Sequence, residues 1–267
     1  MVGSDILIAV IGVTGAGKTS FVAQASGRQD LETSHDIESC AQSVVPVKCT
    51  IDGQVVTLID TPGFDDSRRN EVQILKLVAT YLSLTHGAGK RLTGIVFVQP
   101  MEAARLTGSE LLRTTVFRKL LGADAYRRVV IAPTMWEHLG EAAAAARQEQ
   151  RVRREDVWGH MVAQGAVVMR HSDNALSAAA IVRHLVAFAD GGRHAEPQIQ
   201  RERAANGGNL AETAAGRRLD FELGEAKIAE LRREHLARAD EINKLRAEVD
   251  MLYEEREDLQ RMCWQLS

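Results

Sequence analysis

The residues with the most specific chemistry lie near the start of the chain, where an apolar run, Ile6–Ile11, leads into a glycine-rich stretch. From Gly12 to Thr19 this stretch reads G-x-x-x-x-G-K-T. Glycines let successive backbone N–H groups converge on an anion, because no Cβ stands in the way. The pattern predicts a strand, a phosphate-binding loop and the start of a helix that together hold a nucleoside triphosphate. A glycine-rich turn that matches by chance is the alternative.

Each residue of this loop has an expected role. Lys18 is expected to reach the β- and γ-phosphates, and the Thr19 hydroxyl to ligate Mg²⁺. The helix that begins near Lys18 adds its positive N-terminal end to the anion site. The residues predicted to contact the phosphates are Gly12, Thr14, Gly15, Ala16, Gly17, Lys18, Thr19 and Ser20.

A second motif, Asp60-Thr61-Pro62-Gly63, follows the strand-like run Val55–Ile59. An acidic residue at the tip of a buried strand beside a phosphate loop is a typical Mg²⁺ partner, so Asp60 joins Thr19 as a predicted metal residue. The Gly63 backbone N–H is expected to sense a γ-phosphate. Taken alone, the motif would fit an ordinary Asx-Pro turn. Its place about forty residues after the phosphate loop favours a nucleotide-sensing switch.

Strand-like and helix-like patterns alternate from Ile6 to about Ala189, which predicts an α/β fold with a mostly parallel six-stranded sheet flanked by helices. Asp52-Gly53 predicts an antiparallel hairpin inside this pattern. The expected strands are Leu7–Ile11, Val44–Ile51, Val55–Ile59, Ile95–Gln99, Val129–Ala132 and Val167–Met169. The expected helices are Thr19–Gln24, Arg69–Leu84, Ser109–Leu121, Glu141–Met161 and Ala175–Phe188, with Ser109 at a helix start and Gly122 as a stop.

Composition narrows the classes of partner. The 267 residues carry a net charge of −3, which does not favour nucleic acid or an anionic membrane surface. Three cysteines without a C-x-x-C pair indicate reduced thiols, so the default expectation is a cytoplasmic protein. We find no apolar run long enough to span a bilayer, and peripheral membrane contact stays open. The histidines show no metal-ligand spacing, so Mg²⁺ bound with the nucleotide is the expected metal. The mixed charges of Arg151–Asp156 suggest a solvated face.

With the loop G-V-T-G-A-G-K-T and the switch D-T-P-G-F-D-D, the chain resembles the septin and immunity-associated branch of P-loop GTPases, which includes the GIMAP and Toc proteins. It is especially similar to AIG-type G domains of fungi. The resemblance covers roughly Ile6–Phe188. It implies a domain that binds GTP or GDP with Mg²⁺ and pairs face to face across its nucleotides, with a homodimer as the expected partner.

The alternating pattern and the resemblance predict a G domain over 1–189. Glycines, Pro197 and polar residues then predict a linker over 190–210, and a long charged stretch without proline predicts a helical extension over 211–267. The extension carries heptad positions that are strictest over Ile242–Leu252, with a β-branched residue at a and leucine at d. This pattern favours a parallel two-stranded coiled coil. A helix that folds back on the G domain is the alternative, and both need a partner surface.

The sequence departs from the family pattern at the base-reading motif [NT]-K-x-D. The corresponding residues are Thr134-Met135-Trp136-Glu137, in which Glu137 still offers a carboxylate to guanine and Trp136 is expected to cover the base. Arg170 and His171 are expected to form the opposite wall of the base pocket. The absent lysine leaves a weakly selective site, and hence an ATPase, as an alternative.

Two further departures concern hydrolysis. Ala41 stands where relatives carry a switch threonine, and the sequence does not say whether this alanine is natural or introduced. Phe64 stands where a glutamine orients water in other GTPases. The resemblance puts Arg105 where an arginine reaches the partner's nucleotide, and a solvated loop cation is the alternative. We therefore predict a slow GTPase, activated on dimerisation, with Lys18, Gly63 and Arg105 in catalytic roles. A nucleotide-binding scaffold without turnover is the rival.

Overall fold

The computed structural model describes residues 6–28, 45–61, 92–101, 106–136, 139–188, 197–207, 209, 212–218, 220, 221, 224 and 244. The chain divides into two compact units, 1–220 and 221–267. The predicted helix Arg69–Leu84 lies outside the described residues. The predicted coiled-coil segment Ile242–Leu252 also lies outside them, apart from Lys244. Both elements therefore stay predictions.

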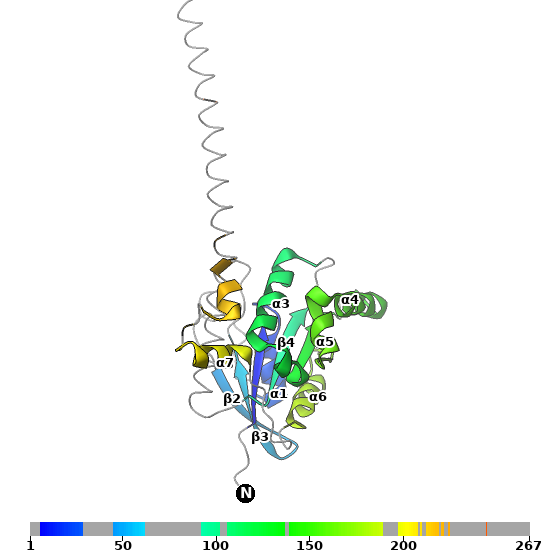
Figure 1. Ribbon diagram of the computed structural model, residues 1–267. Coiled ribbons are helices and arrows are strands. Elements are labelled where there is room, and N and C mark those ends of the chain that lie inside the picture. Colours follow the sequence, from blue (N-terminus) through cyan, green and yellow to red (C-terminus); the bar gives the residue numbers. More distant parts are fainter. Residues whose placement is uncertain are drawn as a thin grey trace, which may run out of the picture. The chain divides into compact units, whose positions relative to one another are not determined.

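Six strands form one sheet in the order β2-β3-β1-β4-β5-β6, and every neighbouring pair is parallel except β2 and β3 (Figure 1). This confirms the predicted mostly parallel six-stranded sheet. The central strands β1, β4 and β5 are mostly apolar and almost entirely buried, because both faces of a parallel sheet are covered. The strands are β1 (Ile6–Gly12), β2 (Val45–Ile51), β3 (Gln54–Asp60), β4 (Gly94–Pro100), β5 (Val129–Thr134) and β6 (Val167–Val168).

The hairpin between β2 and β3 turns at Asp52-Gly53, as predicted. Both residues have positive φ, 49° and 80°, which is the backbone that a two-residue hairpin turn requires. The turn brings Ile51 opposite Gln54 and sets the register of the antiparallel pair. Arg183 forms an ion pair with Asp52 at 2.5 Å and ties the turn to the C-terminal half of the domain.

Helices cover both faces of the sheet. On β4, Gly94 packs against Leu185 of one helix, whereas Phe97 stacks on Phe117 of another with ring centroids 3.8 Å apart. Positions three apart in a strand point to opposite faces, so these two helices lie on opposite sides of β4. The helices are α1 (Lys18–Ser26), α3 (Gly108–Leu121), η1 (Ala123–Arg128), α4 (Glu141–Arg153), η3 (Glu155–Gly159), α5 (His160–Ala163), α6 (Ala175–Val186) and α7 (Gln198–Ala205). Among the described helices, none combines the length and apolar character needed to cross a membrane.

Helix α3 begins at Gly108, one residue before its predicted start at Ser109. The Thr107 side chain accepts a hydrogen bond from the Glu110 N–H, so Thr107, not Ser109, is the N-cap. At the other end Gly122 is the C-cap, which confirms the predicted stop. The predicted start is therefore one residue late, and the cap lies two residues before Ser109.

The predicted helix Glu141–Met161 is broken. Helix α4 ends at Arg153, Arg154 takes an extended backbone, and the short helices η3 and α5 follow. Gly159 returns so close to α4 that an added Cβ would lie 2.7 Å from the Val152 carbonyl oxygen. A continuous helix would prevent this close return of the chain.

The predicted solvated face over Arg151–Asp156 is wrong for Arg151. Its side chain is 1% exposed and forms a bidentate ion pair with Glu110. Arg153 and Arg154 do lie at the surface, paired with Glu149 and Asp156. The sequence run therefore mixes one buried cation with two surface cations.

The predicted linker 190–210 contains a packed helix, α7. Ile199 is fully buried, and Arg201 forms an ion pair with Asp124 of η1 at 2.7 Å. Gly122 leaves room for this contact, because an added Cβ there would lie 2.8 Å from the Gln198 Cβ.

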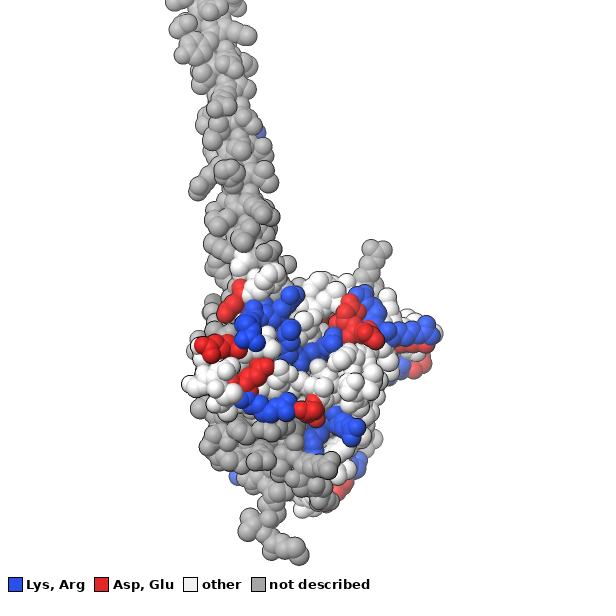
Figure 2. Space-filling model, in the orientation of Figure 1, with Lys and Arg blue, Asp and Glu red and all other residues white. Residues whose placement is uncertain are grey.

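On the described surface, cationic and anionic side chains are interspersed over the visible face (Figure 2).

Candidate nucleotide-binding site

The phosphate-binding loop follows β1, at the edge where the carboxyl ends of the parallel strands meet. Gly12 pairs with Val98 of β4, and a Cβ at Gly12 would lie 2.5 Å from the Val98 carbonyl oxygen. Only glycine allows this approach. At the end of the loop Gly17 has φ of 89°, a left-handed conformation that turns the chain into α1. Thr14 and Gly15 between them are exposed.

Lys18 lies folded against the loop. Its side chain is 6% exposed, and Nζ donates a hydrogen bond to the Val13 carbonyl oxygen at 2.8 Å. Gly17 at the N-cap of α1 provides no side-chain cap, and no acidic residue lies in the first turn. The N–H groups at this helix start are therefore not satisfied by a side-chain cap, as a phosphate-binding loop requires.

Thr19 and Asp60 meet at the ends of α1 and β3. The Thr19 hydroxyl donates a hydrogen bond to Asp60 Oδ2 at 2.8 Å, and the register pairs Asp60 with Val10 of β1. Burial raises the pKa of the Asp60 carboxyl, although the Thr19 hydrogen bond and the charge of Lys18 act to lower it. The second carboxylate oxygen, Oδ1, is buried and has no hydrogen-bond partner among the described residues.

This donor set fits Mg²⁺. A hydroxyl and a carboxylate are the hard oxygen ligands that Mg²⁺ uses with phosphate oxygens and water. The described residues contain no cluster of three or more His, Cys, Asp or Glu side chains that could hold a metal. Thr19 and Asp60 therefore match a metal held jointly with a bound phosphate.

Beyond the phosphate loop, the ends of β5 and β6 approach each other. The Thr134 hydroxyl donates to the Ala16 carbonyl oxygen at 2.9 Å, which ties the end of β5 to the loop. Met135 has φ of 56°, and the Trp136 indole Nε1 donates to the His171 carbonyl oxygen at 3.0 Å. Thr134 ends β5 and Trp136 follows it, and their contact with a base stays a prediction.

The predicted base-pocket wall, Arg170 and His171, is already engaged by protein. The Arg170 guanidinium lies over the Trp136 ring, 4.9 Å from its centroid, and is held by Gln148 and Glu141 of α4. The His171 side chain is 2% exposed, packs edge-on against Phe21 and contacts the Ser177 hydroxyl at 2.9 Å. These two side chains brace the loops, and their contact with a base stays a prediction.

Several predicted site residues lie outside the described residues: Gly63, Arg105 and Glu137, together with Ala41 and Phe64. Ser20 is described, in the first turn of α1 and partly exposed. The sequence does not single out Val98 and Met101, whose backbones contact Gly12 and the Thr134 carbonyl. Backbone contacts that depend on sheet register leave no residue-type signal.

Comparison with known proteins agrees with this geometry. Residues 7–110 match the family model described as 50S ribosome-binding GTPase. GTP-binding protein A of Dictyostelium discoideum is 28% identical over 133 residues, which cover 50% of this chain and 28% of that protein. The match therefore spans little more than a quarter of that relative's length.

Solved structures of Toc33 from Arabidopsis thaliana share the fold. A dimerisation-deficient mutant has a TM-score of 0.58 at 14% identity, and covers 72% of this chain and 87% of that one. The complex with Mg²⁺ and GMPPNP has a TM-score of 0.54 at 15% identity, with the same coverage. Sheet order, phosphate loop and these matches together show that the chain has the α/β fold of a P-loop GTPase G domain.

Proposed function

We propose that this protein binds guanine nucleotide with Mg²⁺, hydrolyses GTP slowly and couples its nucleotide state to the association of two copies. One observation carries the proposal: Lys18, Thr19 and Asp60 converge at the ends of β1 and β3 around an uncapped helix start. The Toc33 complexes with GMPPNP or GDP and Mg²⁺ have this fold, which supports the choice of ligand.

In this proposal the protein groups act mainly by binding and orienting the phosphates. The loop N–H groups and Lys18 hold the phosphates, and Lys18 exchanges its bond to the Val13 carbonyl for phosphate oxygens. Thr19 and Asp60 would hold Mg²⁺, and the metal would supply positive charge where phosphate oxygens become more negative during transfer. The Gly63 N–H reports the γ-phosphate to the rest of the switch.

We place the chain in the septin and immunity-associated branch of GTPases, near the AIG-type domains. The phosphate loop and the D-T-P-G-F-D-D switch support this placement, and so does the shared fold with Toc33. One Toc33 structure is described with dimerisation as important for GTPase activity. That finding on a relative in fold supports a homodimer here, with Arg105 acting on the partner's nucleotide.

Two residues favour a second candidate, a scaffold that binds nucleotide without turnover. Phe64 cannot orient an attacking water, and Ala41 has no oxygen for the metal if it occupies the switch threonine position. A third candidate, an ATPase, draws its support from Met135, which stands where the family motif has lysine.

The discriminating experiment measures GTP and ATP turnover by the purified chain over a wide range of protein concentration, with binding affinities taken in parallel. A dimer-activated GTPase gives activity per molecule that rises with concentration and prefers GTP. Tight guanine-nucleotide binding with flat, negligible turnover supports the scaffold. Equal affinity for ATP and GTP contradicts the guanine assignment, because a specific base site discriminates by orders of magnitude.

A further inference from the structure

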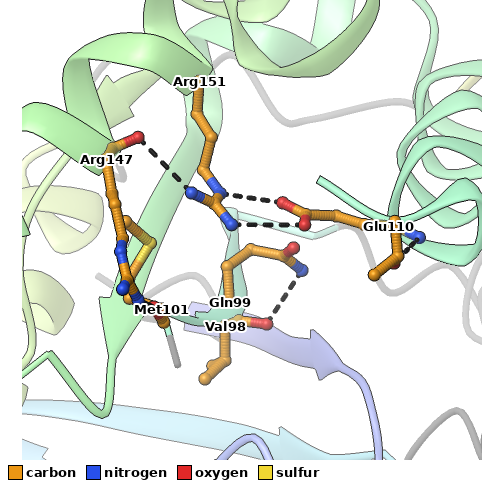
Figure 3. A network of polar contacts seen from close by, with 7 residues as sticks. Val98, Gln99, Met101, Glu110, Arg147 and Arg151 are labelled. Carbon is orange, nitrogen blue, oxygen red and sulfur yellow. Dashed lines mark hydrogen bonds and ion pairs between the residues drawn. The ribbon is translucent and has the colours of Figure 1, made fainter. Parts of the chain in front are cut away.

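Two arginines of helix α4, four residues apart, bind two different parts of the domain: the segment after β4 and the start of α3. Arg147 Nη1 donates to the Met101 carbonyl oxygen at 2.8 Å, directly after β4. Arg151 donates from Nε and Nη2 to the two carboxylate oxygens of Glu110, at 2.8 and 3.2 Å, at the start of α3 (Figure 3). Residues four apart share a face of a helix, so one face of α4 holds both β4 and α3.

The buried Arg151–Glu110 ion pair holds this face of α4 against α3. Its side chains are 1% and 9% exposed, and the bidentate geometry fixes the relative orientation of α4 and α3. The Arg151 guanidinium also lies over the Trp158 ring, 5.9 Å from its centroid. A buried ion pair with these contacts resists movement, because breaking it leaves an unpaired charge inside the protein.

From Met101 a chain of hydrogen bonds runs on to the phosphate-binding loop. The Met101 N–H donates to the Thr134 carbonyl oxygen at 2.9 Å, and the Thr134 hydroxyl donates to the Ala16 carbonyl oxygen at 2.9 Å. Met101, Thr134 and Ala16 are each at most 4% exposed. Water competes little for these groups, so the position of one constrains the next.

The end of β4 meets the loop at a second point. The Val98 carbonyl oxygen lies against Gly12, where an added Cβ would be 2.5 Å away, and it accepts a hydrogen bond from the Gln99 side chain at 3.0 Å. Figure 3 shows Val98, Gln99 and Met101 grouped beside the two arginines. A shift of the β4 end therefore acts on the loop at Gly12 and, through Thr134, at Ala16.

We propose that Arg147 is a positioning residue for the phosphate-binding loop, acting through Met101 and Thr134. The inference rests on the proposed function, since it concerns how the nucleotide site is held ready. The guanidinium fixes the Met101 carbonyl group, and with it the backbone of this residue. The Met101 N–H fixes the end of β5, and the Thr134 hydroxyl fixes Ala16. Without the charged donor, the loop samples shapes that bind phosphate less well, and nucleotide affinity falls by the fraction of molecules that remain competent.

The test compares Arg147→Met with Arg153→Met on the same helix, by titration with fluorescent GDP in Mg²⁺. Arg147→Met keeps the aliphatic stem and removes the donor, so we expect GDP affinity to fall about tenfold, the scale of one lost hydrogen bond to a charged group. Arg153 is 75% exposed and paired only at the surface with Glu149, so its variant is expected to bind as the wild type does. Wild-type affinity in Arg147→Met overturns the proposal.

A double-mutant cycle separates positioning from a general loss of structure. Thr134→Val removes the last link, so adding Arg147→Met to it is expected to cost little further affinity. Fully additive losses overturn the relay. Arg147→Lys, which keeps a charged donor, is expected to recover part of the affinity. If Arg147→Met does not fold, Arg147→Gln, which removes the charge and keeps a polar side chain, replaces it in the cycle.

The two proposals fail in different ways. If neither the wild type nor any variant binds guanine nucleotide, the proposed function is wrong. If the wild type binds GDP, Lys18→Ala does not, and Arg147→Met binds as tightly as the wild type, the nucleotide site stands and the positioning role of Arg147 is wrong.

Discussion

The hydroxyl of Thr19 donates a hydrogen bond to Oδ2 of Asp60 across 2.8 Å, and so joins the first turn of α1 to the end of β3. The two residues are forty-one positions apart in the chain. The parallel pairing of β1 with β3 brings them together, because it sets Asp60 beside Val10, just before the phosphate loop. The proposed function requires these two oxygens to serve one metal ion.

Asp60→Asn tests this placement. The amide keeps the size of the side chain but removes the negative charge, so we expect affinity for GDP in excess Mg²⁺ to fall about tenfold or more. Affinity measured in a chelator should change little, because only the metal contribution is lost. Asp52→Asn, at the exposed hairpin turn, is the matched control. An equal loss with and without Mg²⁺ would mean that Asp60 does not serve a metal.

Gly12→Ala tests the close contact between β1 and β4. A Cβ placed 2.5 Å from the Val98 carbonyl oxygen forces the backbone apart, at a cost of about 1–3 kcal/mol in the free energy of unfolding. Nucleotide affinity should fall as well. Gly108→Ala is the control, since a Cβ there meets no atom within 4 Å and the residue lies in a helix. Urea unfolding measures the stability of the two variants. A Gly12→Ala variant as stable as the wild type would refute the steric argument.

Local signals in the sequence were enough to predict the sheet and the phosphate loop. Asp52-Gly53 specifies its hairpin through positive φ values, and Gly122 ends α3 as expected. The glycine-lysine-threonine pattern predicts the loop because each of these residue types has one specific role in binding phosphate or metal. These features depend on neighbours in the chain, which a single sequence displays.

Contacts between distant elements were not predictable. Arg151 sits in a charged run that reads as surface, and only its contact with Glu110, 41 residues earlier, makes it buried. The return of Gly159 onto α4 and the packing of α7 beside η1 likewise depend on tertiary contacts. The predicted base-reading side of the site is the part that the sequence describes least well, because Arg170 and His171 are held by partners on α4, α1 and α6.

Arg151→Ala is expected to be strongly destabilising. It leaves the Glu110 carboxylate buried without its cation, which costs about 3–5 kcal/mol in the free energy of unfolding. Urea denaturation followed by circular dichroism measures the loss. The double variant Glu110→Leu with Arg151→Met removes both charges and should recover most of it. A loss below about 1 kcal/mol for the single variant would mean that the pair behaves as a surface ion pair.

Arg105→Ala addresses the trans role. If Arg105 reaches a partner's nucleotide, the variant should lose the rise of GTP turnover with protein concentration while GDP affinity stays nearly intact. Arg127→Ala, in η1, provides a control in another part of the domain. A concentration dependence that survives in Arg105→Ala would assign the activation to another residue.

The central claim is that the loop Gly12–Thr19 holds the phosphates of a guanine nucleotide. Calorimetric titration of GDP into the wild type and into Lys18→Ala, both in Mg²⁺, tests it most directly. We expect tight binding by the wild type and loss of measurable binding by Lys18→Ala, with the fold of the variant intact by circular dichroism. Equal GDP affinity in the two proteins would contradict the phosphate-loop assignment.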